Sequence, residues 1–215
     1  MMNYIAERRQ EEKERRRVEI LAAAEEVTAH AGWDELTMDQ VARRARLSRA
    51  LLYVYFKDKA DLMYGICERG MVLLRGRFDE AVSQHPRGLD QVIALGRAYI
   101  AFSETYPVYF DIMARCQLRE GTSENVPANE LAVQAAGDGM TELIVQVIHA
   151  GLRDGSIRTD LGNPMVAAMA LWGFLNGALQ VVTTKAKILD RTGVDARRML
   201  EQSVQLAAHA IAART

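Results

Sequence analysis

Residues 37–62, TMDQVARRARLSRALLYVYFKDKADL, decide how this chain folds. Thr37 can accept a hydrogen bond from the backbone N–H of Gln40, and the Gln40 side chain can reach back to Thr37 in a reciprocal capping box. Apolar residues then recur at helical spacing through Val41 and Ala42. The pattern predicts a short helix with one apolar side.

The second half of this stretch predicts a turn and another helix. Residues 45–47 form the expected turn, and Ser48 can cap a helix of about two turns. Leu52 and Phe56 lie four residues apart on that helix, so both face inward. Two short helices joined by a tight turn, with a third starting at once, are typical of a helix-turn-helix, whose second helix enters the major groove of DNA. The side chains left pointing outward are Arg49, Ala50, Tyr53 and Tyr55.

The charge of this stretch supports DNA binding, although the charge of the whole chain does not. The chain has 27 basic and 28 acidic residues. Between residues 40 and 60, however, six basic residues stand against one acid, Asp58. Such a local excess is the electrostatic footprint of phosphate contact, and an ordinary solvated helix face is the alternative. The helix-turn-helix pattern favours the first interpretation. The six are Arg43, Arg44, Arg46, Arg49, Lys57 and Lys59.

Composition predicts an all-α protein. The 215 residues are 49% hydrophobic, with only 15 Gly and 4 Pro, and no stretch alternates apolar and polar residues over the length of a strand. We expect a DNA-binding head that contains the helix-turn-helix at residues 1–62 and a larger helical body at residues 63–215. A polar break at 120–127 predicts a loop. Outside the helix-turn-helix the expected helices are 11–31, 58–83, 89–105, 107–118, 128–153, 164–189 and 195–213, about nine in all.

One apolar stretch, residues 165–182, is long enough to be weighed as a membrane span. It carries Asn176 and Gln180, and Asn163 with Pro164 supplies the start of a soluble helix. We therefore expect a helix buried within the fold or against another subunit, and no membrane partner. Residues 3–19 are mostly charged, which is unlike an export signal and predicts a cytoplasmic protein.

The sequence offers no pattern for catalysis, metal binding or a cofactor. It contains no Ser/His/Asp arrangement, no phosphate-cradling glycine loop and no cluster of His or Cys at metal-ligand spacing. Cys67 and Cys116 are interpreted as small buried hydrophobic residues in a reducing compartment. We expect no enzymatic activity, no catalytic residue, no metal and no cofactor. The histidines are scattered at His30, His85, His149 and His209.

Residues 20–62 resemble the DNA-binding domain of the TetR (tetracycline-repressor-type) family of bacterial transcription regulators. The resemblance implies an all-helical homodimer whose head binds a palindromic DNA operator and whose body holds a small effector. It also implies a repressor rather than an activator. The matching residues are Ile20, Leu21, Ala23, Ala24, Gly32, Trp33, Thr37, Val41, Ala42, Ala45, Leu47, Ser48, Leu52, Tyr53, Tyr55, Phe56, Lys59 and Leu62.

Three positions depart from the family pattern. Arg46 stands where a turn glycine is usual, so either a left-handed residue costs about 1 kcal/mol there or the turn is shifted. Leu51 replaces a hydroxyl residue on the recognition helix and can touch a thymine methyl group. Thr28 occupies a position where the family favours an aromatic residue, so the core of the head is packed differently.

Phosphate contacts set the register on DNA and base contacts set sequence preference, so we assign the two sets separately. Arg49 is the expected reader of base edges, Ala50 and Leu51 offer apolar contact, and Arg44 and Arg46 are outside candidates. Tyr53 has an alternative role as a packing residue. The expected phosphate contacts are Thr37, Ser48, Tyr53, Tyr55, Lys57 and Lys59.

Large apolar residues in the body suit a pocket for an apolar or aromatic effector, although any helical core of this size needs such residues too. The candidates are Tyr99, Phe102, Tyr106, Tyr109, Phe110, Met113, Met140, Met169 and Trp172, with Glu104, Asp111, His149 and Asn176 as polar anchors. The resemblance implies a homodimer through the last two helices. The residues suited to it, or to an internal core, are Leu171, Phe174, Leu175, Leu179, Val182, Leu200, Val204, Ala207 and Ile211.

Two other classes of function stay open. One is a helical enzyme or ligand-binding protein whose head no longer binds DNA. The other is a DNA-binding regulator without a small-molecule effector. Loss of operator binding on adding a ligand separates the second of these from a ligand-responsive repressor.

Overall fold

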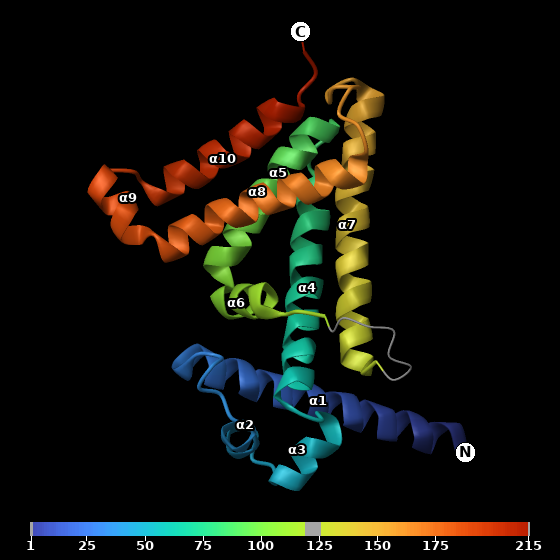
Figure 1. The fold of residues 1–215 in the computed structure, drawn as a ribbon. Coiled ribbons are helices and arrows are strands. Elements are labelled where there is room, and N and C mark those ends of the chain that lie inside the picture. The colour runs from blue at the N-terminus through green and yellow to red at the C-terminus, as the bar shows by residue number, and fades with distance from the viewer. Residues whose placement is uncertain (1, 119–125, 215) are drawn as a thin grey trace. The chain divides into compact units, whose positions relative to one another are not determined.

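The computed structural model describes residues 2–118 and 126–214, and over these ranges the chain is helical (Figure 1). The all-α prediction is confirmed: within the described residues the β-pairing is limited to one isolated bridge between Ile157 and Ala212. All but the last two residues of the loop predicted at 120–127 lie outside the described ranges. The helices are α1 (Met2–Ala31), α2 (Met38–Arg44), α3 (Arg49–Tyr55), α4 (Lys59–Ser83), α5 (Gly88–Thr105), α6 (Pro107–Arg115), α7 (Ala128–Asp154), α8 (Pro164–Thr184), α9 (Ala186–Thr192) and α10 (Ala196–Ile211).

Most helices end within three residues of their predicted bounds, for example α6 at Arg115 rather than residue 118, and two differ more. Helix α1 begins at Met2 rather than near residue 11. Its charged first half contains ion pairs between residues one turn apart, such as Arg16 with Glu19 at 2.7 Å. The helix expected at 164–189 is divided at Lys185 into α8 and α9. The β-branched run before this break favours helix weakly, and the Thr184 hydroxyl donates to the Gln180 carbonyl at 2.7 Å, which competes with backbone pairing.

The chain forms two compact units. The first comprises residues 1–70 and 107–135, and the second comprises residues 71–106 and 136–215. Helix α4 passes from one unit to the other between Gly70 and Met71. The first unit therefore contains α6 and the start of α7 in addition to the head. The boundary predicted between residues 62 and 63 instead separates the DNA-binding residues from those expected to bind an effector and to dimerise.

The core of the first unit forms where α1, α2, α3 and α4 meet. Trp33 and Leu36 are buried. The buried Thr28 hydroxyl donates to the Ala24 carbonyl at 2.8 Å, so this departure from the family pattern is satisfied within α1. A Cβ on Gly65 would lie 2.9 Å from Leu21, which shows how closely α4 approaches α1. The buried side chains of this core include Ile20, Leu21, Val41, Leu52, Phe56, Leu62 and Ile66.

In the second unit α10 packs against both α5 and α8, and α8 and α10 run side by side (Figure 1). A Cβ on Gly88 would lie 2.1 Å from the backbone nitrogen of Gly151, so α5 can approach α7 this closely only because residue 88 is glycine. Four residues of α10 that were predicted for either an internal core or a dimer contact are buried within this chain. They are Leu200, Val204, Ala207 and Ile211.

Candidate nucleic-acid interface

The first helix of the helix-turn-helix begins with the predicted capping box. Thr37 has extended backbone angles (φ −119°, ψ 151°), and its hydroxyl accepts the backbone N–H of Gln40 at 3.3 Å. The Gln40 side-chain oxygen in turn accepts the backbone N–H of Thr37 at 2.7 Å. This reciprocal pair satisfies two otherwise unpaired donors and sets the start of α2.

In the turn between α2 and α3, Arg46 has a left-handed backbone conformation, which is one of the two alternatives predicted from the sequence. Its φ is 56°, and the next backbone N–H, that of Leu47, donates to the Ala42 carbonyl at 2.9 Å. The turn is therefore not shifted, and Arg46 itself takes the conformation that glycine adopts most easily. Left-handed geometry costs roughly 1–2 kcal/mol for a residue with a Cβ. The Arg46 side chain is exposed.

Helix α3 presents a small outward face. Ser48 caps it by accepting the backbone N–H of Leu51 at 3.2 Å, as predicted. Leu52 and Phe56 are fully buried, which also confirms their predicted orientation. Val54 is 72% exposed, and sequence reasoning missed it. It lies one turn after Ala50, so helical periodicity could have placed both on the outward face. The other exposed residues of this face are Arg49, Ala50, Leu51 and Tyr53.

Arg49 is held at the surface by two neighbours. Its Nε lies 3.2 Å from the Asp39 carboxylate of α2, and its guanidinium lies 5.6 Å from the centre of the Tyr53 ring. The hydrogen bond to the Tyr53 hydroxyl, followed by the charge of Asp39, raises the pKa of Arg49. The cation is thus positioned between the two helices, beside the outward face of α3.

The other predicted DNA-binding residues occupy different settings. Arg44 is exposed and pairs with Glu26 of α1. Thr37, Ser48 and Lys57 are exposed, whereas Tyr55 is half-buried. Lys57 also donates its backbone N–H to the Asp61 carboxylate at 2.9 Å, which steadies the start of α4.

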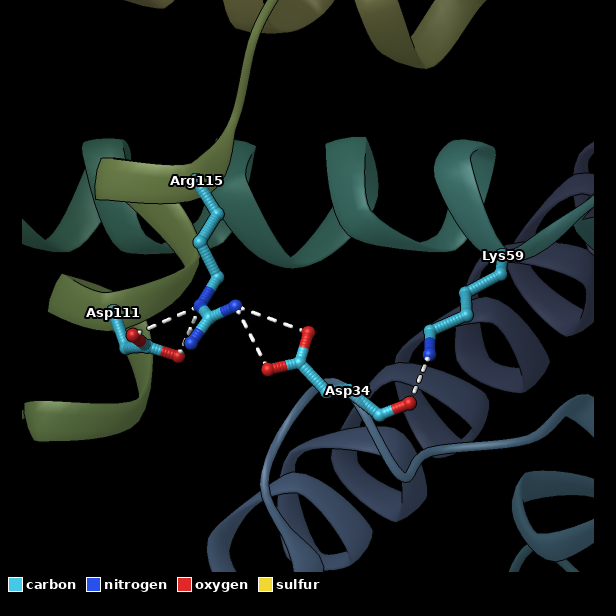
Figure 2. A network of polar contacts seen from close by, with 4 residues as sticks. All are labelled: Asp34, Lys59, Asp111 and Arg115. Carbon is cyan, nitrogen blue, oxygen red and sulfur yellow. Dashed lines mark hydrogen bonds and ion pairs between the residues drawn. The ribbon is translucent and has the colours of Figure 1, made fainter.

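Lys59 is turned toward the loop that precedes α2. Its ammonium donates to the Asp34 carbonyl at 3.0 Å and lies 5.1 Å from the centre of the Trp33 ring. The Asp34 carboxylate lies 3.1 Å from the guanidinium of Arg115 of α6, and the same guanidinium lies 2.9 Å from the Asp111 carboxylate; Figure 2 shows this network. Hydrogen bonds to Asp111, followed by its charge, raise the pKa of Arg115.

The predicted effector residues are divided between the two units. Six of the nine apolar candidates lie in the second unit, and Tyr109, Phe110 and Met113 lie in the first. In the second unit Tyr99 and Phe102 are buried on α5, and the Tyr99 hydroxyl donates to Asn176 of α8 at 3.3 Å. Burial raises the pKa of Tyr99. Tyr106 and Met140 are half-buried, whereas Met169 and Trp172 are 41% and 50% exposed.

A groove of about 530 Å³ lies between α4 and α5 in the second unit. Phe102 and Tyr106 line it, and their ring centres are 5.2 Å apart. It also contains two cations that sequence reasoning missed: Arg77, which donates to the Tyr106 hydroxyl at 3.1 Å, and Arg97, which pairs with Glu201 at 2.5 Å. No sequence signal distinguished these arginines from other exposed helical ones.

Within the described residues no group of three or more His, Cys, Asp or Glu side chains could hold a metal ion. Among the described helices α8 is long and apolar enough to cross a membrane, with a mean hydropathy of 1.6, and 22% of its apolar window is buried. A helix that packs against a second subunit meets the same criterion, because its exposed apolar face is covered in the assembly.

Comparison with known proteins identifies the family. Residues 20–64 match the family model described as bacterial regulatory proteins, tetR family. Residues 92–210 match the model described as tetracyclin repressor-like, C-terminal domain. The HTH-type transcriptional repressor BepR of Brucella suis biovar 1 (strain 1330) is 28% identical over 167 residues, which cover 73% of this chain and 77% of that protein.

Solved structures share the fold over nearly the whole chain. A bacterial regulatory protein in the tetR family from Rhodococcus RHA1 has a TM-score of 0.65 at 20% identity, covering 93% of this chain and 98% of that one. The transcriptional regulator FadR from Bacillus subtilis, solved in complex with stearoyl-CoA, has a TM-score of 0.68 at 16% identity, covering 90% and 98%. Since the second family model alone spans more than half of the residues, the chain belongs to the TetR family of bacterial regulatory proteins and is a DNA-binding transcriptional regulator.

Proposed function

We propose that this regulator is a homodimeric repressor that binds a palindromic operator and is released by a small, largely apolar effector. One observation carries the DNA-binding part of the proposal. The outward face of α3 is exposed, and Arg49 is held beside it by Asp39 and Tyr53. A two-fold dimer that reads DNA in this way requires half-sites about one helical turn or more apart.

The contacts on DNA divide into reading and positioning. Arg49 reads a base edge, since an arginine bidentate to guanine contributes about 1–3 kcal/mol of discrimination. Ala50, Leu51 and Val54 offer apolar contact to thymine methyl groups. The proposed phosphate contacts are Thr37, Ser48, Tyr53, Tyr55, Lys57 and Lys59, with Arg44 and Arg46 as further cations. Of these, Lys59 must exchange its bond to the Asp34 carbonyl for a phosphate oxygen.

The exposed apolar face of α8 supports the homodimer. Val166, Trp172 and Phe174 are 65%, 50% and 46% exposed, which is costly for a helix that stays in water. A Cβ on Gly173 or Gly177 would meet no atom of this chain, so a second helix can approach closely there. Because the predicted α10 residues are buried internally, the pairing relies on α8 together with exposed positions of α10 such as Leu206.

The effector part of the proposal rests on apolar residues in the body and on a distant structural relative. FadR from Bacillus subtilis, which shares the fold, was solved with stearoyl-CoA, and this supports an apolar ligand for the present chain. The proposed lining within the second unit is Tyr99, Phe102, Tyr106, Met140, Met169 and Trp172. Such a ligand releases DNA only insofar as it binds the non-operator state more tightly.

Fluorescence anisotropy of the purified protein on DNA from upstream of its own gene, against scrambled DNA, tests the proposal. Tight binding to the upstream DNA alone, by two subunits per site, supports a sequence-specific dimeric regulator. Addition of long-chain acyl thioesters or aromatic compounds then tests release. Operator binding that no such compound alters would favour regulation without an effector. Failure to bind any DNA at low salt would favour a ligand-binding protein or an enzyme with a non-functional head.

Replacing Arg49 by alanine should reduce the preference for operator over scrambled DNA by about 1–3 kcal/mol, because a base contact is lost. Lys59→Ala should instead weaken binding to both DNAs and lower the salt dependence by about one charge. Arg153→Ala, an exposed change at the end of α7, is the control and should alter neither. Equal loss of affinity for both DNAs in Arg49→Ala would contradict base reading by Arg49.

We also propose that the protein acts in the cytoplasm, without catalytic activity and without a membrane partner. Its operator is cytoplasmic in a bacterium, and the sequence offers no catalytic arrangement.

A further inference from the structure

The two cysteines of the chain, Cys67 and Cys116, lie together in the first unit. Cys67 is fully buried in α4, and Cys116 is half-buried, directly after the last residue of α6. Both are free thiols, and a hydrogen bond joins them. Sequence analysis treated them as unrelated hydrophobic residues, so their pairing is a product of the fold.

Contacts on both sides hold the two thiols in place. The Tyr64 hydroxyl donates to the Gln117 carbonyl at 3.2 Å. On the other side, a Cβ on Gly70 would lie 3.1 Å from both the Met113 sulfur and the Tyr109 Cβ. Positions 64, 67 and 70 are spaced three apart, so they share one face of α4. That face of α4 runs antiparallel to α6 and to residues 116–117, which follow α6. The thiol pair lies in the middle of these contacts.

We propose that Cys67 and Cys116 are an oxidisable dithiol, which a hydroperoxide converts to an intramolecular disulfide between α4 and the end of α6. The two thiols are unequal in a way that suits this reaction. Cys116 is the more accessible. Its hydrogen bond from Cys67 lowers the pKa of Cys116, whereas the same contact and burial raise the pKa of Cys67. Cys116 is therefore the attacking thiolate and Cys67 the resolving thiol.

The reaction takes two steps. The Cys116 thiolate attacks the terminal oxygen of the hydroperoxide, the O–O bond breaks, and the alkoxide leaves with a proton as alcohol, or as water from hydrogen peroxide. Cys116 is then a sulfenic acid. The Cys67 sulfur next attacks the Cys116 sulfur, the S–O bond breaks, and the hydroxide leaves as water with the proton of Cys67. Two thiols and one peroxide thus yield one disulfide, one alcohol and one water.

Contacts within the same unit connect the disulfide to the DNA-binding head. Forming it brings the two sulfurs to about 2.05 Å and pulls residue 116 toward α4. The preceding residue, Arg115, pairs with Asp34 at 3.1 Å, and Asp34 also accepts the Lys59 ammonium (Figure 2). Asp34 lies in the loop that leads to the Thr37 cap of α2. Oxidation therefore loosens this loop and lowers operator affinity, a consequence that rests on the proposed function.

The chemistry is tested on the reduced full-length protein, treated with hydrogen peroxide and then alkylated. Intact mass should show the loss of two hydrogens with no alkylation, and peptide mapping should join Cys67 to Cys116. In Cys67→Ser, and in Cys67→Ala as a second variant, Cys116 should accumulate a sulfenic acid that dimedone traps. In Cys116→Ser the buried Cys67 should stay reduced. Thiols that remain alkylatable in the wild-type protein, or a disulfide between two chains, would overturn the dithiol.

The regulatory consequence is tested separately by anisotropy on the operator. Reduced wild-type protein should bind, and oxidation should weaken binding by about fivefold or more, as is usual for coupled sites. Dithiothreitol should restore it, and Cys67→Ser should be insensitive to this cycle. A disulfide that forms without changing operator affinity would overturn the regulatory role alone. If reduced protein fails to bind the operator, the proposed function fails, while the mass measurement still decides the dithiol.

Discussion

Arg46 shows how a single residue balances stability against function. A backbone φ of 56° suits glycine, yet the chain places a long cation there, exposed at the turn before the recognition helix. The strain of roughly 1–2 kcal/mol is tolerated because hydrogen bonds on both sides define the turn. A cation at this position adds attraction for phosphate, which glycine cannot supply.

Arg46→Gly should therefore stabilise the protein and weaken its DNA binding. Relief of strain, less the greater flexibility of glycine in the unfolded chain, leaves about 0.5–1 kcal/mol of added stability in urea unfolding. Affinity for operator and scrambled DNA should fall together, with a smaller salt dependence. Arg46→Lys keeps both the charge and the strain, so it should resemble the wild type. A glycine variant that binds DNA as tightly as the wild type would show that Arg46 makes no phosphate contact.

At the scale of elements, the start of α5 depends on a residue distant in sequence. Helix α5 starts after Arg87, which makes no side-chain cap. The missing cap comes from Asp154 at the end of α7, whose carboxylate accepts the backbone N–H of Gly88 at 2.7 Å and that of Ser156 at 2.8 Å. Hydrogen bonds from Ser156 and then from Gly88 lower the pKa of Asp154. One carboxylate thus joins α5, α7 and the turn after α7.

This cap should make stability depend on pH. Since the folded pKa of Asp154 lies below its ordinary value of 3.8, the contribution is fully present above pH 3.8 and is lost as pH falls through the folded pKa. Asp154→Asn should lower the urea midpoint at pH 7 and reduce the further loss between pH 4 and pH 2, both measured by circular dichroism. An unchanged acid-induced loss in the variant would mean that other carboxylates account for it.

For the whole molecule, the exposed face of α8 is the feature that a single chain leaves unexplained. Phe174 and Val166 are large and exposed in a helix whose composition suits burial. A second copy of the chain can cover that face while placing two heads on one DNA duplex. Dimerisation through α8 would thereby bury its exposed apolar residues and also bring two DNA-binding heads together.

Phe174→Glu should convert the dimer to a monomer, because a charge would be buried at the interface while the single chain is left undisturbed. Size-exclusion chromatography with light scattering should show half the mass at micromolar concentration, with an unchanged circular dichroism spectrum. Operator affinity should fall by at least about tenfold, since two linked heads bind more tightly than one. Val72→Glu, at an apolar site on α4 that is 64% exposed against 46% for Phe174, is the control. A Phe174→Glu protein that remains dimeric would place the interface elsewhere.

The helix-turn-helix could be predicted from interactions between residues that are close in sequence. The capping box, the Ser48 cap and the inward pair Leu52 and Phe56 each depend on residues within one turn of helix, so spacing alone reveals them. Val54 was missed although it lies one turn after Ala50, which the sequence placed on the outward face. The break at Lys185 was missed because hydropathy reports burial rather than the competition between threonine hydroxyls and backbone pairing.

The sequence by itself determined the helices, the DNA-reading turn and the family, since these follow from periodicity, capping and local charge. Only the tertiary structure decided which distant side chains meet: Arg115 with Asp34, Asp154 with Gly88, and Cys67 with Cys116. It also assigned the apolar residues of α10 to an internal core and left those of α8 exposed. The physical reason is that burial and pairing depend on how helices cross, which no spacing within one helix specifies.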